Sequence, residues 1–125
     1  MNDELNHTQT LDPEQERAKA AVLSECDKLA AAGITFAAAH FDGCGDEGTV
    51  EQVKCYQAPS YSYYDSEPVP FDAEHLQEHF DALVPLGFGD NCGSFGDVIL
   101  DVKARKLTVE YNERFEDYNT TSYEI

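Results

Sequence analysis

The segment formed by residues 97–111 has the clearest structural pattern in the chain. Residues 97–102 read D-V-I-L-D-V, residues 107–111 read L-T-V-E-Y, and K-A-R-K stands between them. Every second residue of each run is apolar: Val98, Leu100 and Val102 in the first, Leu107, Val109 and Tyr111 in the second. Because successive side chains of a strand point to opposite faces, this pattern predicts a β-hairpin with one buried face.

The sequence of the first half of the chain indicates a helix followed by two strands. Asp12, Pro13 and Gln15 form a helix start, with a capping carboxylate, a first-turn proline and a side chain that can reach back to the cap. The helix is predicted over residues 13–32, because Gly33 can take the left-handed conformation that ends helices. Strands are predicted at residues 34–41 and 49–56, on either side of the glycine-rich turn 42–48.

An irregular connector and a second helix separate these strands from the hairpin. Residues 57–71 contain three prolines, which exclude regular structure, and the next helix begins at Asp72 and ends near Pro85. The expected fold is therefore a single α+β domain over residues 12–115. Its element order is αββαββ, with a mostly antiparallel four-stranded sheet and two helices packed on one face. Residues 1–11 are expected to be flexible, and 116–125 to form a loose or edge-strand tail.

The strong negative charge of the chain limits the kinds of molecule that it can bind. The chain has 25 acidic and 8 basic residues, a formal net charge of −17, and residues 55–102 hold nine Asp or Glu with no Lys or Arg. Such a chain repels nucleic acid and anionic membranes and attracts basic proteins and divalent cations. We expect a cytoplasmic protein, because no apolar run reaches the roughly 20 residues of a membrane helix and the start lacks the features of a signal peptide. The four cysteines are widely spaced and are expected to be free thiols.

A tyrosine-rich acidic stretch is the predicted partner-binding surface. Tyrosine is common in interfaces because it offers a large rigid contact area together with a hydroxyl group. Carboxylates in a row could imitate the phosphates of nucleic acid, whereas the competing interpretation is a solvated face that serves solubility. The candidate residues are Tyr61, Tyr63, Tyr64, Asp65, Glu67, Asp72, Glu74, Glu78 and Asp81.

Metal binding is the main alternative. The acidic turn offers Asp42, Asp46, Glu47 and Glu51 as oxygen ligands, although it does not fit the EF-hand register, and the competing interpretation is a solvated turn. Residues 75–79 read H-L-Q-E-H and match a zinc-protease motif, but the two histidines are predicted to lie on the solvent face of their helix. His40 and Cys44 could pair as base and nucleophile, yet the acidic surroundings oppose a thiolate. No catalytic residue and no cofactor are assigned.

Three segments resemble a known family. They are A-A-G-I-T at residues 31–35, F-D-G-C-G-D-E-G-T-V-E at 41–51, and the region from G-D-V at 96–98 to Y-N-E-R-F at 111–115. They are similar to small bacterial and mobile-element proteins of a domain-of-unknown-function family, DUF6878. The resemblance spans about residues 30–115. It implies a prokaryotic or phage setting and brings no catalytic residues.

These observations favour a non-enzymatic acidic protein that binds a basic protein, for instance as a nucleic-acid mimic that inhibits a nuclease or a defence complex. Two alternatives stay open. One is a divalent-metal-binding module or a small metal-dependent hydrolase, and the other is a structural subunit of an operon-encoded complex.

Overall fold

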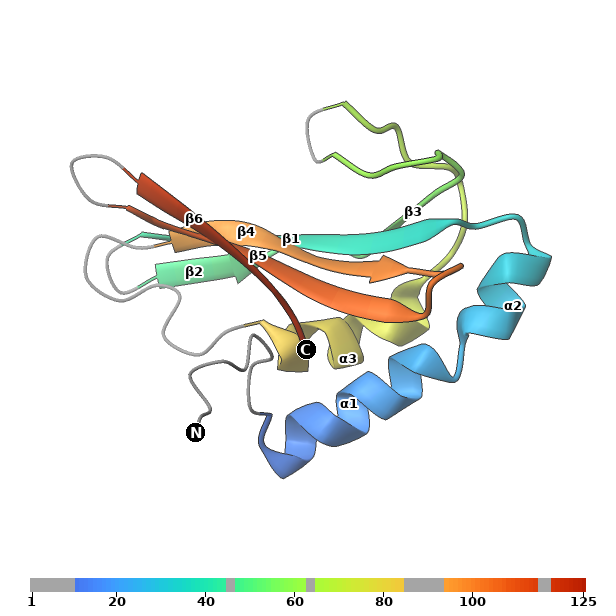
Figure 1. Cartoon of the computed structure of the whole chain (residues 1–125), viewed down its shortest axis with the longest axis horizontal. Helices are drawn as coiled ribbons and strands as arrows, with labels where there is room; N and C mark the ends of the chain where they lie inside the picture. Colours follow the sequence, from blue (N-terminus) through green and yellow to red (C-terminus); the bar gives the residue numbers. More distant parts are fainter. Residues whose placement is uncertain (1–10, 45–46, 63–64, 85–93, 115–117) are drawn as a thin grey trace, which may run out of the picture.

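The computed structural model describes residues 11–44, 47–62, 65–84, 94–114 and 118–125. Within these ranges the element order is α1, α2, β1, β2, β3, α3, β4, β5, β6, which confirms the α+β class. Figure 1 shows two layers: a twisted sheet, and helices α1 (Pro13–Leu23) and α3 (Glu74–Leu83) packed below one of its faces. None of these helices combines the length and the apolar character that crossing a membrane requires.

The first helix starts as predicted, but it is interrupted. The Gln15 backbone N–H donates to Asp12 Oδ1 at 2.8 Å, and the Asp12 N–H donates to Gln15 Oε1 at 3.2 Å. The prediction of one helix over 13–32 is wrong, because α1 ends at Leu23 and α2 (Cys26–Ala31) follows. At the break the Ser24 hydroxyl donates to the Ala21 carbonyl at 2.6 Å. Such local side-chain bonds compete with the helical backbone and bend helices.

Gly33 ends α2 as the sequence predicts. It has a φ of +82°, and its N–H donates to the Ala30 carbonyl at 3.0 Å while the Ile34 N–H donates to the Leu29 carbonyl at 2.9 Å. These two bonds form a Schellman motif, in which a left-handed residue satisfies the last carbonyls of a helix. The chain thereby turns directly into the first strand.

The sheet contains more strands than the sequence predicts. Among the described residues it has six antiparallel strands in the order β2-β1-β4-β5-β6, and β3 also pairs with β1. The predicted strand 49–56 is divided into β2 (Glu47–Val50) and β3 (Lys54–Tyr56). Between them the Val53 N–H donates to Gln77 Oε1 of α3 at 2.8 Å, and the Val53 side chain is buried. The irregular spacing of Val50 and Val53 thus marks a break in the strand.

The C-terminal hairpin is confirmed. Strands β4 (Ser94–Asp101) and β5 (Lys106–Arg114) pair with Val98 opposite Val109 and Leu100 opposite Leu107. Strand β6 (Tyr118–Glu124) lies beside β5 at the edge of the sheet, in the segment for which the sequence leaves a loose tail or an edge strand open. The central strand β1 (Phe36–Cys44) is longer than the predicted 34–41 because it continues into the glycine-rich turn.

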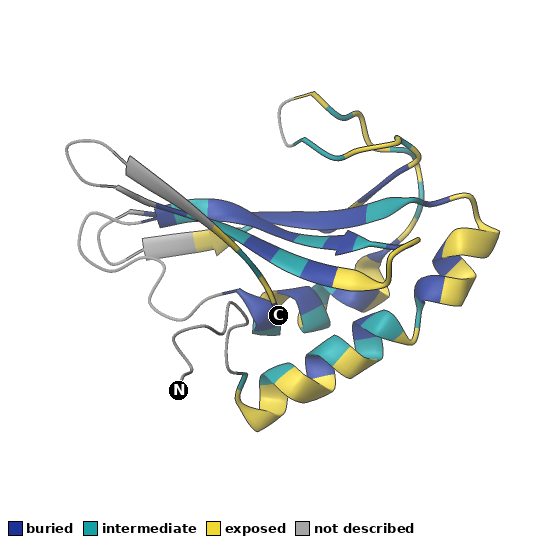
Figure 2. Cartoon of the chain, viewed as in Figure 1, coloured by how far each residue is buried: buried dark blue, intermediate teal, exposed yellow. Residues whose placement is uncertain are grey.

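Alternating side chains separate the two faces of the sheet. Ala37, Ala39 and Phe41 of β1 belong to the core beneath the helices, whereas Ala38 and His40 have the opposite orientation. Figure 2 shows the buried residues concentrated along the middle strands and on the inner sides of the helices. Core residues from the helices and from β4 and β5 complete this layer: Val22, Leu29, Leu76, Phe80, Leu83, Val98, Leu100, Leu107 and Val109.

Cys26 and Cys55 are buried free thiols, in agreement with the prediction, whereas Cys92 and the side chain of Cys44 lie outside the described residues. Burial raises the pKa of Cys55 to about 11, from 9.0. At neutral pH this thiol is therefore protonated, and it acts as a small apolar core residue.

This pKa shift gives a pH-dependent stability. The thiol contributes its full stabilisation below pH 9, and the contribution is lost as the pH rises towards 11, because the unfolded chain ionises first. We expect the loss from this thiol to reach about 2 to 3 kcal/mol. Urea unfolding of the parent chain and of Cys55→Val, followed by circular dichroism between pH 8 and about 11, should show the steeper loss in the parent. Parallel curves would contradict the assignment.

Candidate binding site on the open face of the sheet

A row of polar side chains crosses the face of the sheet that the helices leave uncovered. Asp97 of β4 stands opposite His40 of β1 on one side and opposite Glu110 of β5 on the other. Directly opposed residues in an antiparallel sheet have Cβ atoms about 5 Å apart. The strand register therefore places one imidazole and two carboxylates next to one another.

Asp97 is the centre of a hydrogen-bond network. It is 4% exposed, and its Oδ1 accepts from His40 Nδ1 at 3.1 Å and from the Tyr61 hydroxyl at 3.0 Å. A carboxylate oxygen accepts, so this contact matches the His40 tautomer that has its proton on Nδ1. Buried carboxylates need such partners because water no longer solvates them. The sequence pattern identifies Asp97 only as the first residue of a strand and does not predict this network.

The proline-rich connector brings Tyr61 to the sheet. The Val69 N–H donates to the Cys55 carbonyl at 2.8 Å, which ties the connector to β3, and the Ser62 N–H donates to Ser66 Oγ at 2.8 Å. The ring of Tyr61 lies edge-on to Tyr56, with centroids 5.0 Å apart. Burial, and next the negative charge of Asp97, raise the pKa of Tyr61 far above its usual value. Its hydroxyl therefore remains a hydrogen-bond donor.

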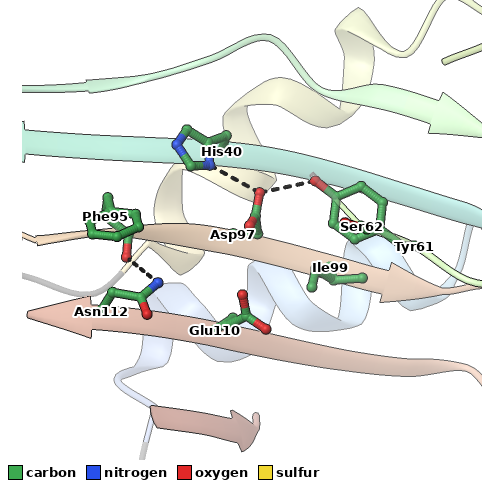
Figure 3. A pocket seen from close by; sticks show the side chains of 8 residues that line it. All are labelled: His40, Tyr61, Ser62, Phe95, Asp97, Ile99, Glu110 and Asn112. Carbon is green, nitrogen blue, oxygen red and sulfur yellow. Dashed lines mark hydrogen bonds and ion pairs between the residues drawn. The ribbon is translucent and has the colours of Figure 1, made fainter. Parts of the chain in front are cut away.

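These residues surround a small cavity. Its volume is about 170 Å³, and Figure 3 shows the side chains from three strands and the connector that enclose it. The lining consists of His40, Tyr61, Ser62, Phe95, Asp97, Ile99, Glu110 and Asn112. Binding sites for drug-sized ligands are typically about 300 to 1,000 Å³, so this cavity suits a single small polar group. The described part of its lining contains no lysine or arginine.

A histidine paired with an aspartate also occurs in nucleophilic catalysis, where a serine or cysteine completes the set. Ser62 lines the cavity, but its hydroxyl donates to Asp65 Oδ2 at 3.4 Å. The serine is thus directed to a carboxylate other than Asp97. Among the described contacts, none joins the Ser62 hydroxyl to the His40–Asp97 pair.

The predicted partner-binding residues lie in two places. Asp65 and Glu67 are exposed residues of the connector. Figure 1 shows the described parts of this connector on the side of the sheet opposite the helices. Asp72 caps the turn before α3, accepting from the Glu74 N–H at 3.0 Å, and Glu78 is exposed on α3 itself. Asp81 is exposed as well and accepts from Gln77 Nε2 at 2.9 Å.

The tyrosines of that prediction differ in their surroundings. Tyr61 is half-buried and its hydroxyl binds Asp97, so it contributes to the cavity. Tyr63 and Tyr64 lie outside the described residues.

The predicted metal ligands are only partly described. Asp42 and Glu51 are exposed, whereas Asp46 and the side chain of Glu47 fall outside the described residues. In the H-x-x-E-H segment, His75 Nε2 lies 3.3 Å from Glu25 Oε1, and His79 is half-buried beside α1. Across the described ranges, no group of three or more His, Cys, Asp or Glu side chains could hold a metal ion.

The comparisons with known proteins give one match. The model of a family described as "Family of unknown function (DUF6878)" matches residues 67–125. The resemblance to DUF6878 is confirmed over these residues. No curated protein and no solved structure matches the chain.

The DUF6878 match contains α3 and strands β4 to β6, including the Y-N-E-R-F segment, but not the F-D-G-C-G-D-E-G turn at 41–48. It therefore includes both cavity carboxylates, Asp97 and Glu110. His40 and Tyr61 come from the part of the chain that the match does not cover.

Proposed function

We propose that this chain is a non-enzymatic acidic protein that binds the basic surface of another protein. One observation carries the proposal. All six predicted acidic contacts are exposed, and within the described part of the chain none of them forms an ion pair. They are Asp65, Glu67, Asp72, Glu74, Glu78 and Asp81. Unpaired surface carboxylates create a negative potential that attracts a positively charged partner.

Several of the chain's few cations are already engaged elsewhere. Arg105 pairs with Asp27, Lys106 Nζ lies 3.8 Å from Glu124, and Lys28 Nζ lies 3.9 Å from Glu25. None of these pairs involves the exposed acids of the connector or of α3. Two other cations lie nearer to these segments without forming an ion pair among the described residues: Arg17 lines a pocket with Glu78, and Lys54 lines one with Ser66 and Pro68 of the connector. They reduce the negative field over the two segments in part.

A more specific version of this proposal is that the acidic surface imitates nucleic acid. Glu74, Glu78 and Asp81 are spaced by four and three residues, so they follow one face of α3 at intervals of about 5 to 6 Å. One strand of B-DNA carries a phosphate about every 3.4 Å. The helix imitates the sign and alignment of the phosphates at a lower charge density, so a basic partner is better supported than a strict DNA mimic.

A defined cationic probe tests the proposal. We expect a fluorescently labelled deca-arginine peptide to bind the chain, with an affinity that falls steeply between low and physiological salt. Charge reversal at the exposed α3 position, Glu78→Lys, should weaken binding by about tenfold. Glu16→Lys on α1 makes the same change of charge outside the proposed surface and should have a much smaller effect.

Fluorescence anisotropy measures both quantities. Competition with a known DNA-binding domain and its DNA distinguishes mimicry from general binding of basic proteins. Absence of peptide binding at low salt, or equal effects of the two charge reversals, would contradict the proposed surface.

A further inference from the structure

The open face of the sheet contains an unusual pair of carboxylates. Asp97 and Glu110 are direct cross-strand neighbours, and both line the same cavity. Like charges placed directly opposite each other destabilise a sheet. Among the described residues that line this cavity, His40 is the one side chain that can carry a positive charge. A bound cation would reduce the repulsion between these two carboxylates.

Both carboxylates retain hydrogen-bonding capacity. Asp97 receives its two hydrogen bonds on Oδ1, and no donor from the described residues reaches its Oδ2. Glu110 is half-buried, and its carboxylate forms no hydrogen bond or ion pair with any described residue. Figure 3 shows the Glu110 side chain on the strand next to the one that holds Asp97. A buried acceptor without a donor is costly, which makes Asp97 Oδ2 a specific binding point.

The chemistry of the lining selects the type of cation. A bound Ca²⁺ or Mg²⁺ takes six or more oxygen ligands, and the described residues include no group of acidic, cysteine or histidine side chains suited to a metal. The cavity also has two aromatic rings, Tyr61 and Phe95, in its wall. Aromatic faces attract organic cations, and they stack best with the planar guanidinium group. A guanidinium also offers several N–H donors in a fixed plane, which suits two neighbouring carboxylates.

We propose that this cavity is a guanidinium-binding site, in which Asp97 Oδ2 and the Glu110 carboxylate accept the N–H groups of the ligand. His40 and Tyr61 hold Asp97 in position through its other oxygen. The volume of about 170 Å³ accepts one such group and excludes a larger cofactor. If the partner is the basic protein proposed above, on which this step depends, the guanidinium is that of an inserted arginine side chain. A small free guanidine compound is the other source of the same group.

Titration with small cations tests the site without any protein partner. We expect methylguanidinium to bind with a dissociation constant on the order of 1 mM, and methylammonium of the same charge to bind at least several-fold more weakly. Two-dimensional amide NMR reads out both binding and location. Glu110→Gln keeps the shape of the side chain, removes one charge and should weaken methylguanidinium by about tenfold. Glu16→Gln on α1 is the matched control and should bind like the parent chain.

Two further binding experiments identify the molecule that supplies the guanidinium group. An arginine-containing basic peptide that loses affinity in Glu110→Gln, while a lysine peptide of equal charge does not, supports an arginine of a protein partner. Binding of agmatine with no preference for arginine over lysine peptides supports a free guanidine compound.

The two proposals fail in different ways. Absence of methylguanidinium binding, or equal binding to the parent chain and to Glu110→Gln, overturns the cavity proposal even if deca-arginine binds the exposed acids. Absence of deca-arginine binding overturns the proposed function even if methylguanidinium occupies the cavity.

Discussion

Replacing Gly96 with alanine is expected to abolish the native packing of β4 against β5. A Cβ atom at this position would lie 1.8 Å from the Glu110 carbonyl oxygen and 3.0 Å from Phe41 Cζ. The nearest obstacle is backbone of the paired strand, which cannot move aside without separating the ladder. We expect Gly96→Ala to destabilise the fold by about 3 kcal/mol or more, a large part of the stability of a small domain. Urea unfolding followed by circular dichroism measures the effect.

Gly33→Ala provides the comparison for this prediction. Gly33 has a φ of +82°, but a Cβ atom there would meet only the Gln57 side chain, at 3.1 Å. Left-handed backbone costs a non-glycine residue roughly 1 to 2 kcal/mol, and the long glutamine can shift. A smaller loss in Gly96→Ala than in Gly33→Ala would contradict the close strand contact at Gly96.

Truncation of Phe80 is expected to have the second large effect. Phe80 is 0% exposed and lies on α3 beneath the sheet, so its removal leaves a cavity at the centre of the two layers. A Phe→Ala change in a core costs about 3 to 5 kcal/mol, from lost burial and from the unfilled space. The same unfolding assay, with differential scanning calorimetry for the melting temperature, measures the loss.

Phe36→Ala is the matched control for Phe80→Ala. Phe36 is only partly buried at the start of β1 and does not belong to the core cluster. Its truncation should cost less than half as much. Should Phe80→Ala fail to fold, Phe80→Leu retains most of the volume, and its smaller loss should still exceed that of Phe36→Ala. Equal losses at the two positions would show that α3 does not cover the sheet.

The parts of the fold that were predictable rest on local signals. Asp12 and Gln15 specify a capping box by themselves, and Gly33 supplies the left-handed residue of a helix end. The hairpin follows from period-two alternation. The break at Ser24 and the division of β2 from β3 depend instead on tertiary or competing bonds, such as that from Val53 to Gln77. The spacing of apolar residues in the sequence does not indicate such hydrogen bonds.

The candidate site was harder to predict, because its residues come from distant segments. His40, Asp97 and Glu110 become neighbours only through the register of three strands. A signal was present: each is a polar residue between apolar neighbours in a strand, at the position that faces away from the core. The sequence predicts Tyr61 as a partner-binding residue, and in the structure its hydroxyl donates to Asp97. The acidic surface was predictable because exposure follows directly from charge.

The central claim is that uncompensated acidic groups of this fold exist to receive a basic group. The most direct measurement is a crystal structure of the chain grown with methylguanidinium. We expect planar density between the Asp97 and Glu110 carboxylates, with nitrogen atoms within about 3 Å of both, and its loss in crystals of Glu110→Gln. An empty cavity at saturating ligand, or a lysine or arginine of the same chain already occupying it, would contradict the claim.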